Sequence, residues 1–185
     1  MQSNSFIIPN KGYQDIIYLR KPTEDDLNIM FQILKDTLSK FQNINAECDE
    51  FNQLSIEKND VKDYIINPIF LTFVATHNEQ IVGWCSGSND DSMIEFHGLE
   101  NFDKPFYLRE LVVHSEYQKR GIGKFLFNNM IDTIYTNSNT LVLDTPIQNE
   151  SSIIFYKNLG CIPFINNLIP SNSHWCRLYK IMAKT

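Results

Sequence analysis

A β-type segment that passes through two closely spaced glycines into a helix is the feature that most restricts the fold of this 185-residue chain. Residues 106–113 (FYLRELVV) are rich in β-branched, aromatic and aliphatic side chains, which predicts a strand. Gly121 and Gly123 follow, and apolar residues then recur at helical spacing to about Tyr135. Because a strand leads directly into a helix, we expect a mixed α/β domain.

The remaining segments predict further strands and helices in an order that fits one α/β (α+β) domain. Thr23, followed three positions later by Asp26, is typical of a capping box at a helix start. The polar, acidic residues 88–105 are expected to form a long connection. We expect residues 1–15 to be an N-terminal extension and residues 16–185 to be the domain. The expected strands are 16–20, 70–76, 81–87, 140–145, 161–165 and 175–182, and the other expected helices are 23–38, 56–66 and 150–159.

Composition excludes several classes of protein. Hydrophobic residues make up 43% and charged residues 21%, which are globular values and exclude general disorder. There is no apolar run of membrane-spanning length and no secretory signal at residues 1–5, so we expect a cytoplasmic protein without a membrane partner. The four cysteines lack C-x-x-C spacing and match no zinc pattern, so we expect free thiols and no metal: Cys48, Cys85, Cys161 and Cys176.

Charge is unevenly distributed along the chain. Residues 36–103 hold 13 acidic and three basic residues, a net charge of −10, whereas residues 104–185 hold nine basic and five acidic residues, a net charge of +4. This asymmetry indicates a cationic ligand for the first half and an anionic ligand for the second, or two solvated faces. The total of −6 argues against nonspecific nucleic-acid binding, which requires a basic stripe.

The glycine-bearing turn at residues 118–124 (QKRGIGK) has the properties of an anion site. Backbone amides at a helix N-terminus lack partners and point outward, and the helix dipole adds positive potential. The two glycines permit close approach of a ligand, and Lys119, Arg120 and Lys124 add positive charge. Phosphate or pyrophosphate is the natural ligand of such a turn. The turn matches neither a dinucleotide fingerprint nor a Walker A loop. The alternative is therefore a plain helix start with surface lysines.

Two motifs resemble those of the GNAT superfamily of acetyl-CoA-dependent N-acetyltransferases. The first is the Q-x-x-G-x-G spacing of residues 118–123, which follows the Glu-Leu-Val-Val end of the predicted strand. The second, at residues 149–161, is similar to that superfamily's N-x-x-A-x-x-[FL]-Y-x-x-x-G-F element, with Ser152 in place of Ala and Cys161 in place of Phe. The resemblance implies an acyl-CoA N-acyltransferase fold, with a mixed, splayed central sheet flanked by helices. It also implies acetyl-CoA as co-substrate and no metal.

The resemblance also assigns roles to matching positions. The backbone of Leu111, Val112 and Val113 would pair with the pantetheine arm, and Asn149 would hydrogen-bond on the pantetheine side. Tyr156 would lie near the sulfur of the cofactor. The pyrophosphate would be held by the amides of the turn, which belong to Gln118, Lys119, Arg120, Gly121, Ile122, Gly123 and Lys124.

Acyl transfer requires a proton acceptor for the amine and a donor for the departing thiolate. Tyr156 is the candidate acid, because its hydroxyl donates a proton without a large pKa shift. A core tyrosine with a satisfied hydroxyl is the alternative. Glu110 is the candidate base, because an unpaired carboxylate in an otherwise apolar strand would be costly. A structural salt bridge with Arg109 of a neighbouring register or with Arg177 is its alternative.

The acceptor is expected to be an amine-bearing, cationic compound or a protein amine, with a homodimer left open. Acidic and aromatic residues suit a cationic amine. The alternatives to an enzyme are a non-catalytic acyl-CoA-binding sensor on the same fold and an interaction module whose turn binds nothing. The resemblance implies that the acceptor pocket is built from the first helices, the loop before the central strand and the last hairpin. The acidic and aromatic residues in those segments are Glu47, Asp49, Glu50, Trp84, Asp90, Asp91, Glu95, Phe96, Asp103, Trp175 and Tyr179.

Overall fold

The structure is a computed structural model that describes residues 5–10, 13–44, 57–164 and 175–182. Two compact units divide the chain. The first comprises Met1–Gly87 and Glu110–Met130, and the second comprises Ser88–Arg109 and Ile131–Thr185. Strand β5 (Pro105–Val113) passes from the second unit into the first between Arg109 and Glu110.

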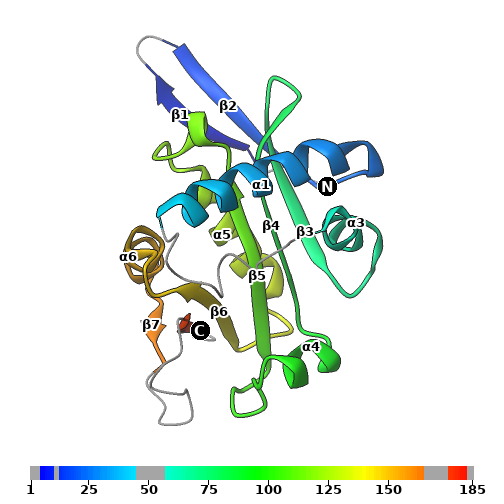
Figure 1. Ribbon diagram of the computed structural model, residues 1–185, viewed down its shortest axis with the longest axis vertical. Coiled ribbons are helices and arrows are strands. Elements are labelled where there is room, and N and C mark those ends of the chain that lie inside the picture. The colour runs from blue at the N-terminus through cyan, green and yellow to red at the C-terminus, as the bar shows by residue number, and fades with distance from the viewer. Residues whose placement is uncertain (1–4, 11–12, 45–56, 165–174, 183–185) are drawn as a thin grey trace. The chain divides into compact units, whose positions relative to one another are not determined.

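Four antiparallel strands and the end of β5 form the sheet of the first unit (Figure 1). Strand β1 (Ser5–Asn10) pairs with β2 (Tyr13–Arg20), and β2 pairs with β3 (Leu71–His77). Strand β3 then pairs with β4 (Gln80–Ser88) through a turn in which Asn78 and Glu79 adopt positive φ values of 48° and 67°. Two positive φ values at the centre of a two-residue loop are typical of the tight turns that join antiparallel strands.

The helices of the first unit begin near the expected residues, but one runs to residue 44 instead of the expected 38, and a short helix at residues 115–117 was not expected. They are η1 (Glu24–Asp26), α1 (Leu27–Ile44), α3 (Lys58–Ile66), η2 (Ser115–Tyr117) and the greater part of α5 (Ile122–Ile134). Buried side chains from α1, α3 and the strands form one hydrophobic cluster, whose members include Met30, Leu34, Val61, Tyr64, Val74 and Trp84.

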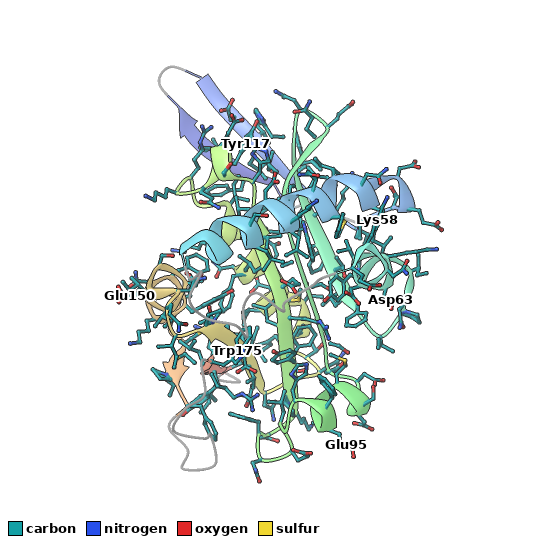
Figure 2. The ribbon with its side chains drawn as sticks, viewed as in Figure 1. Lys58, Asp63, Glu95, Tyr117, Glu150 and Trp175 are labelled. Atoms are coloured by element: carbon teal, nitrogen blue, oxygen red, sulfur yellow. The ribbon has the colours of Figure 1, made fainter. Side chains whose placement is uncertain are left out.

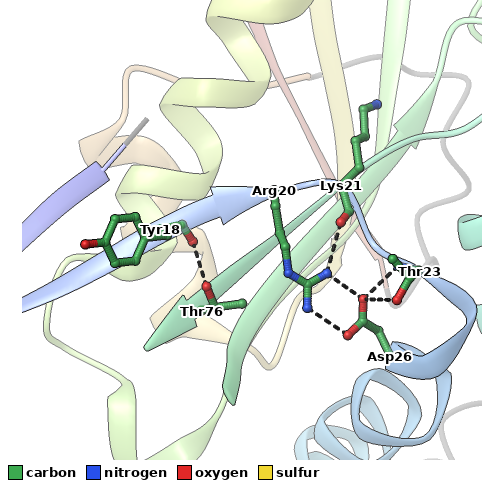
Figure 3. A network of polar contacts seen from close by, with 6 residues as sticks. All are labelled: Tyr18, Arg20, Lys21, Thr23, Asp26 and Thr76. Atoms are coloured by element: carbon green, nitrogen blue, oxygen red, sulfur yellow. Dashed lines mark hydrogen bonds and ion pairs between the residues drawn. The ribbon is translucent and has the colours of Figure 1, made fainter. Parts of the chain in front are cut away.

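The predicted capping box at the start of the first helix is confirmed and is part of a larger polar network (Figure 3). The amide of Thr23 donates to Asp26 Oδ2 at 2.7 Å, and the amide of Asp26 donates back to the Thr23 carbonyl at 3.0 Å. Arg20 clamps the same carboxylate with bonds of 2.6 and 2.8 Å. These hydrogen bonds hold the pKa of Asp26 below its usual value, so the carboxylate stays charged and joins β2 to η1.

The second unit contains the remaining strands and helices. Strand β6 (Thr140–Pro146) pairs in parallel with the first residues of β5 and antiparallel with β8 (Trp175–Ile181), which pairs with the short β7 (Ile162–Pro163). Helix α6 (Glu150–Asn158) follows β6. Hydrogen-bonded neighbours run in the order β1-β2-β3-β4-β5-β6-β8-β7, so the sheet is mixed, as expected for the α/β class.

Besides η2, two further elements were not expected from the sequence. Helix α4 (Asp91–Phe96) lies inside the segment expected to be only a connection, and Asp90 caps it by accepting from the amide of Ser92 at 3.0 Å. Strand β1 and the first residues of β2 lie within residues 1–15.

Trp84 is a core residue, which corrects its expected place in an acceptor pocket. Its side chain is fully buried, its indole N–H donates to the Met30 carbonyl at 3.1 Å, and its ring lies 5.7 Å from that of Tyr64. Strand β4 is buried along almost its whole length, so its side chains do not alternate between the core and solvent. The sequence pattern therefore did not mark Trp84 as a core residue.

Candidate functional site

The turn between β5 and α5 has the backbone geometry that a phosphate-binding loop requires. After η2, Lys119 adopts a φ of 60° and Gly121 a φ of 88°, both in the left-handed region. Residues 118–121 are exposed, and so is Lys124 in the first turn of α5. Within the described part of the chain, no backbone carbonyl accepts a hydrogen bond from the amides of Lys119, Arg120 or Gly121. These amides are therefore available to an anion at the positive end of a 13-residue helix.

Two hydrogen bonds tie the N-terminal side of the turn to the end of β5 and to β4. Gln118 Nε2 donates to the Val113 carbonyl at 3.0 Å, which closes the turn onto the end of β5. The amide of His114 donates to the Val82 carbonyl at 2.8 Å and extends the contact with β4. Gln118, predicted as a cofactor-binding position, thus shapes the turn with its side chain and leaves the backbone of the following residues exposed.

Gly121 lies against the first strand of the chain. A Cβ at this position would be 3.0 Å from Phe6 Cζ, and the Phe6 ring stacks on Phe125 of α5 with centroids 5.4 Å apart. The turn and the start of α5 are therefore packed on β1. Sequence reasoning attributed the need for glycine to the ligand alone, whereas the structure adds both a positive φ and this close neighbour.

The end of β5 carries Glu110, which is the expected base, and the three following residues, which are expected to pair with the pantetheine arm. Val112 is buried, while Glu110, Leu111 and Val113 are partly buried. Gly83 of β4 lies so close that a Cβ there would be 2.9 Å from the Val112 carbonyl oxygen. Glu110 is the first residue of β5 that belongs to the first unit, and it is not without an interaction partner in the structure.

Asn149 and Tyr156 belong to the second unit, whereas Glu110 to Lys124 belong to the first. Asn149 Oδ1 caps α6, accepting from the Ser152 amide at 3.2 Å and from Ser151 Oγ at 2.9 Å. Tyr156 is 8% exposed on α6, with its ring 5.1 Å from that of Phe155. The Asn149 carbonyl oxygen is thus used by the fold itself, and only its amide group remains for a ligand.

A polar cluster that the sequence did not reveal crosses three strands of the second unit. Arg177 donates from Nε and Nη2 to the two oxygens of Asp144, both at 2.8 Å, and the Tyr107 hydroxyl donates to the same carboxylate at 3.3 Å. The hydrogen bond to Asp144 raises the pKa of Arg177, so its guanidinium remains charged. Asp144 and Arg177 face each other in the β6–β8 register, a pairing that only the three-dimensional structure defines.

His97, at the end of α4, lies on this cluster. Its ring stacks on Tyr107 with centroids 3.8 Å apart, and its Nε2 is buried without a hydrogen-bond partner in the described part of the chain. Desolvation lowers the pKa of His97 to about 4, opposed by Asp144 and assisted by Arg109 and Arg177. His97 is therefore a neutral, apolar-like ring near neutral pH.

The remaining predicted residues are placed as follows. Phe96 is 79% exposed, and Tyr179 packs with Phe102 and Phe164. Asp103 accepts from Asn139 at 2.6 Å. Glu95 lies in α4 and Trp175 in β8 (Figure 2). Asp91 is the first residue of α4. Outside the described residues lie Glu47, Cys48, Asp49 and Glu50.

The described cysteines are all free thiols, and burial shifts their pKa values. Desolvation raises the pKa of Cys85 to about 12 and that of Cys161 to about 11, and it also raises that of Cys176. Among the residues that the structure describes, no three His, Cys, Asp or Glu side chains gather as metal ligands. None of the described helices is both long and apolar enough to cross a membrane.

Comparison with known proteins identifies the class. The model of the acetyltransferase (GNAT) family matches residues 35–161, which include the end of β5, the glycine turn, α5 and the whole of the second motif. This chain belongs to the GNAT acetyltransferase family.

Solved structures of low sequence identity share the fold. The PaiA N-acetyltransferase from Thermoplasma acidophilum, solved with coenzyme A, is 15% identical with a TM-score of 0.68, covering 90% of this chain and 99% of its own. NAA60 from Arabidopsis thaliana, solved with acetyl-CoA, is 18% identical with a TM-score of 0.64, and the match covers 88% of this chain and 96% of NAA60. The ribosomal-protein-S18-alanine N-acetyltransferase from Escherichia coli is 16% identical with a TM-score of 0.59, and the match covers 88% of this chain and 90% of that enzyme.

Proposed function

We propose that this chain is an enzyme that transfers an acetyl group from acetyl-CoA to a primary amine. The observation that carries the proposal is the exposed glycine turn at the N-terminus of α5, with amides that no described backbone carbonyl engages, in a chain of the GNAT family. Lys119, Arg120 and Lys124 surround these amides with positive charge. Such a turn suits the pyrophosphate of coenzyme A.

The proposed roles of the end of β5 and of α6 follow from the chemistry of acyl transfer. Acetyl-CoA supplies an activated thioester, whose C–S bond breaks as the new C–N bond forms. We assign Glu110 as the base that accepts the proton of the attacking amine, and Tyr156 as the acid that donates a proton to the sulfur. Leu111, Val112 and Val113 would offer backbone hydrogen bonds to the pantetheine arm, and Asn149 its side-chain amide.

We propose a cationic acceptor, because the net charge of residues 36–103 is −10. A polyamine, an aminoglycoside-like compound, an amino-acid derivative and a protein amine all fit this description. We place the reaction in the cytoplasm, where thiols remain reduced, since the described cysteines are free. Nucleic acid and membrane are not proposed as partners, and a homodimer is an open possibility.

Two measurements test this function in sequence. Calorimetric titration with acetyl-CoA should show saturable binding, and no binding would overturn the proposal. A thiol-release assay over a panel of primary amines should then show turnover with at least one cationic amine. Binding without turnover on any amine would favour an acyl-CoA sensor on the same fold.

A further inference from the structure

His77 connects three elements of the first unit beside the glycine turn. Its Nδ1 lies 3.0 Å from the hydroxyl of Tyr117 in η2, and its Nε2 lies 3.4 Å from Asp15 Oδ1 in β2. The His77 and Tyr117 rings are 5.6 Å apart. The side chains of His77 and Asp15 are 14% and 24% exposed, so water competes only weakly for these contacts.

The two contacts of His77 are chemically compatible in one tautomer. In the tautomer with its proton on Nε2, this nitrogen faces the Asp15 carboxylate, and Nδ1 can accept from the Tyr117 hydroxyl. The Tyr117 ring is thereby held at one end by a side chain from the β3–β4 hairpin. Neither the resemblance nor the spacing of motifs pointed to His77, which lies 40 residues from Tyr117.

Tyr117 in turn contacts the turn itself. The guanidinium carbon of Arg120 lies 5.1 Å from the centroid of the Tyr117 ring, within the range of a cation–π interaction, and the His114 ring lies 6.0 Å from it on another side. Figure 2 shows Tyr117 in this part of the first unit. Because Arg120 is exposed, a long cationic side chain would otherwise sample many rotamers there.

The backbone of the turn cannot by itself fix Arg120. Lys119 and Gly121 on either side are both left-handed, and the described backbone offers no carbonyl to the amides of residues 119–121. The side-chain contacts of Gln118 and Tyr117 are therefore the anchors of this segment.

We propose that Asp15, His77 and Tyr117 form a positioning relay that holds the Arg120 guanidinium at the turn, ready for a phosphate group of the cofactor. The inference rests on the proposed function, since it requires that the turn bind coenzyme A. Tyr117 is a positioning residue: it acts through Arg120 and does not itself touch the reacting atoms.

The test compares four variants by their acetyl-CoA affinity: Tyr117→Phe, Tyr117→Leu, Arg120→Ala and the double variant Tyr117→Leu/Arg120→Ala. Loss of an exposed cation–π contact predicts that Tyr117→Leu weakens binding about threefold to fivefold. Tyr117→Phe keeps the ring and loses only the hydrogen bond, so about twofold weakening is expected. Loss of a phosphate contact predicts about tenfold or more for Arg120→Ala, with the double variant no weaker than Arg120→Ala alone.

S-acetylpantetheine is the discriminating probe, because it lacks the phosphates. Its binding should be unchanged in Tyr117→Leu, whereas general damage to the turn would weaken it. Tyr18→Leu is the matched control, since Tyr18 is 47% exposed on β2 and makes no side-chain contact with the turn among the described interactions. Wild-type affinity is expected for that control.

The outcomes separate the two proposals. A wild-type protein that does not bind acetyl-CoA overturns the proposed function. Wild-type binding with unchanged affinity in Tyr117→Leu, or additive losses in the double variant, overturns the relay. If Tyr117→Leu does not fold, Tyr117→Phe still tests the relay. In that variant the relay requires both a changed ¹⁵N NMR resonance of His77 Nδ1 and weaker acetyl-CoA binding than in the wild type. An unchanged resonance overturns the relay as well.

Discussion

Gly83 and Val112 approach so closely that a Cβ on the glycine would lie 2.9 Å from the carbonyl oxygen of the valine. The same Cβ would be 3.3 Å from the Val113 Cα. Any side chain at position 83 therefore displaces the end of β5, the segment to which we assign contacts with the pantetheine arm.

We expect Gly83→Ala to lower the free energy of unfolding by about 1–3 kcal/mol, the usual cost of overpacking a rigid site. It should also weaken acetyl-CoA binding. Urea denaturation and calorimetry measure the two effects. Gly98→Ala is a suitable comparison, because Gly98 has open space around it and its φ of 62° costs only backbone strain. If Gly83→Ala costs no more than Gly98→Ala, the close approach of β4 and β5 is not rigid.

Gly121→Ala should reduce acetyl-CoA affinity at least tenfold, or about 1.4 kcal/mol. A φ of 88° strains any side chain, and the added Cβ would meet the Phe6 ring at 3.0 Å. The double variant Phe6→Leu/Gly121→Ala removes the ring and should recover part of the lost stability but not the affinity. Full recovery of affinity in the double variant would show that packing on β1, rather than the backbone of the turn, controls binding.

Tyr156→Phe should lower kcat by roughly 10²-fold while acetyl-CoA affinity stays nearly the same, because general acid catalysis contributes that order of magnitude. Steady-state kinetics at saturating substrates, together with calorimetry, gives both quantities. Phe155→Leu, one position away on α6, is the control for disturbed packing. Wild-type kcat in Tyr156→Phe would make Tyr156 a core tyrosine.

Glu110→Gln should depress kcat/KM for the acceptor most at lower pH, where the amine is mostly protonated and its proton must be accepted. Wild-type kcat/KM should also fall as ionic strength rises, because salt screens the attraction between acidic residues and a cationic amine. A pH profile of both proteins at two salt concentrations checks both expectations. If the two pH profiles coincide, Glu110 is not the base, and kinetics that ignore salt would make the acidic excess a solvated face.

The half-buried ring of His97, whose Nε2 is buried without a partner in the described part of the chain, should make folding sensitive to acid. Its pKa is about 4 in the folded protein against 6.5 for an ordinary histidine, so the unfolded chain binds the proton first. The contribution of His97 to stability is complete above about pH 6.5 and is lost as pH falls towards 4. The free energy of unfolding, measured by urea denaturation, should differ less between pH 7 and pH 5 in His97→Phe than in the wild type. An NMR titration should find the wild-type ring neutral at pH 6.

Sequence reasoning located the strand, the glycine turn and the helix of the candidate site, because local signals specify each of them. The Thr23–Asp26 capping box, for example, involves residues only three positions apart. Helix α4 also carried a local signal, the cap at Asp90, but six residues supply too little periodicity to be recognised.

The contacts missed by sequence reasoning are those between distant segments. Strand β1 contains a proline and acquires its structure only by pairing with β2. Trp84 was assigned to a pocket, although β4 is buried on both faces. The His77–Tyr117 and Asp144–Arg177 pairs join residues 40 and 33 positions apart, and no spacing rule predicts them.

The strand order also bears on how copies of this chain meet. The two outermost strands, β1 and β7, each contain a proline, Pro9 and Pro163, and β7 has only two residues. A proline offers no amide to an incoming strand, and a short edge offers few partners, so both edges resist continuation of the sheet into a second molecule. We expect this arrangement of the described strands to disfavour aggregation, and we expect any homodimer to form through side-chain surfaces instead of a shared sheet.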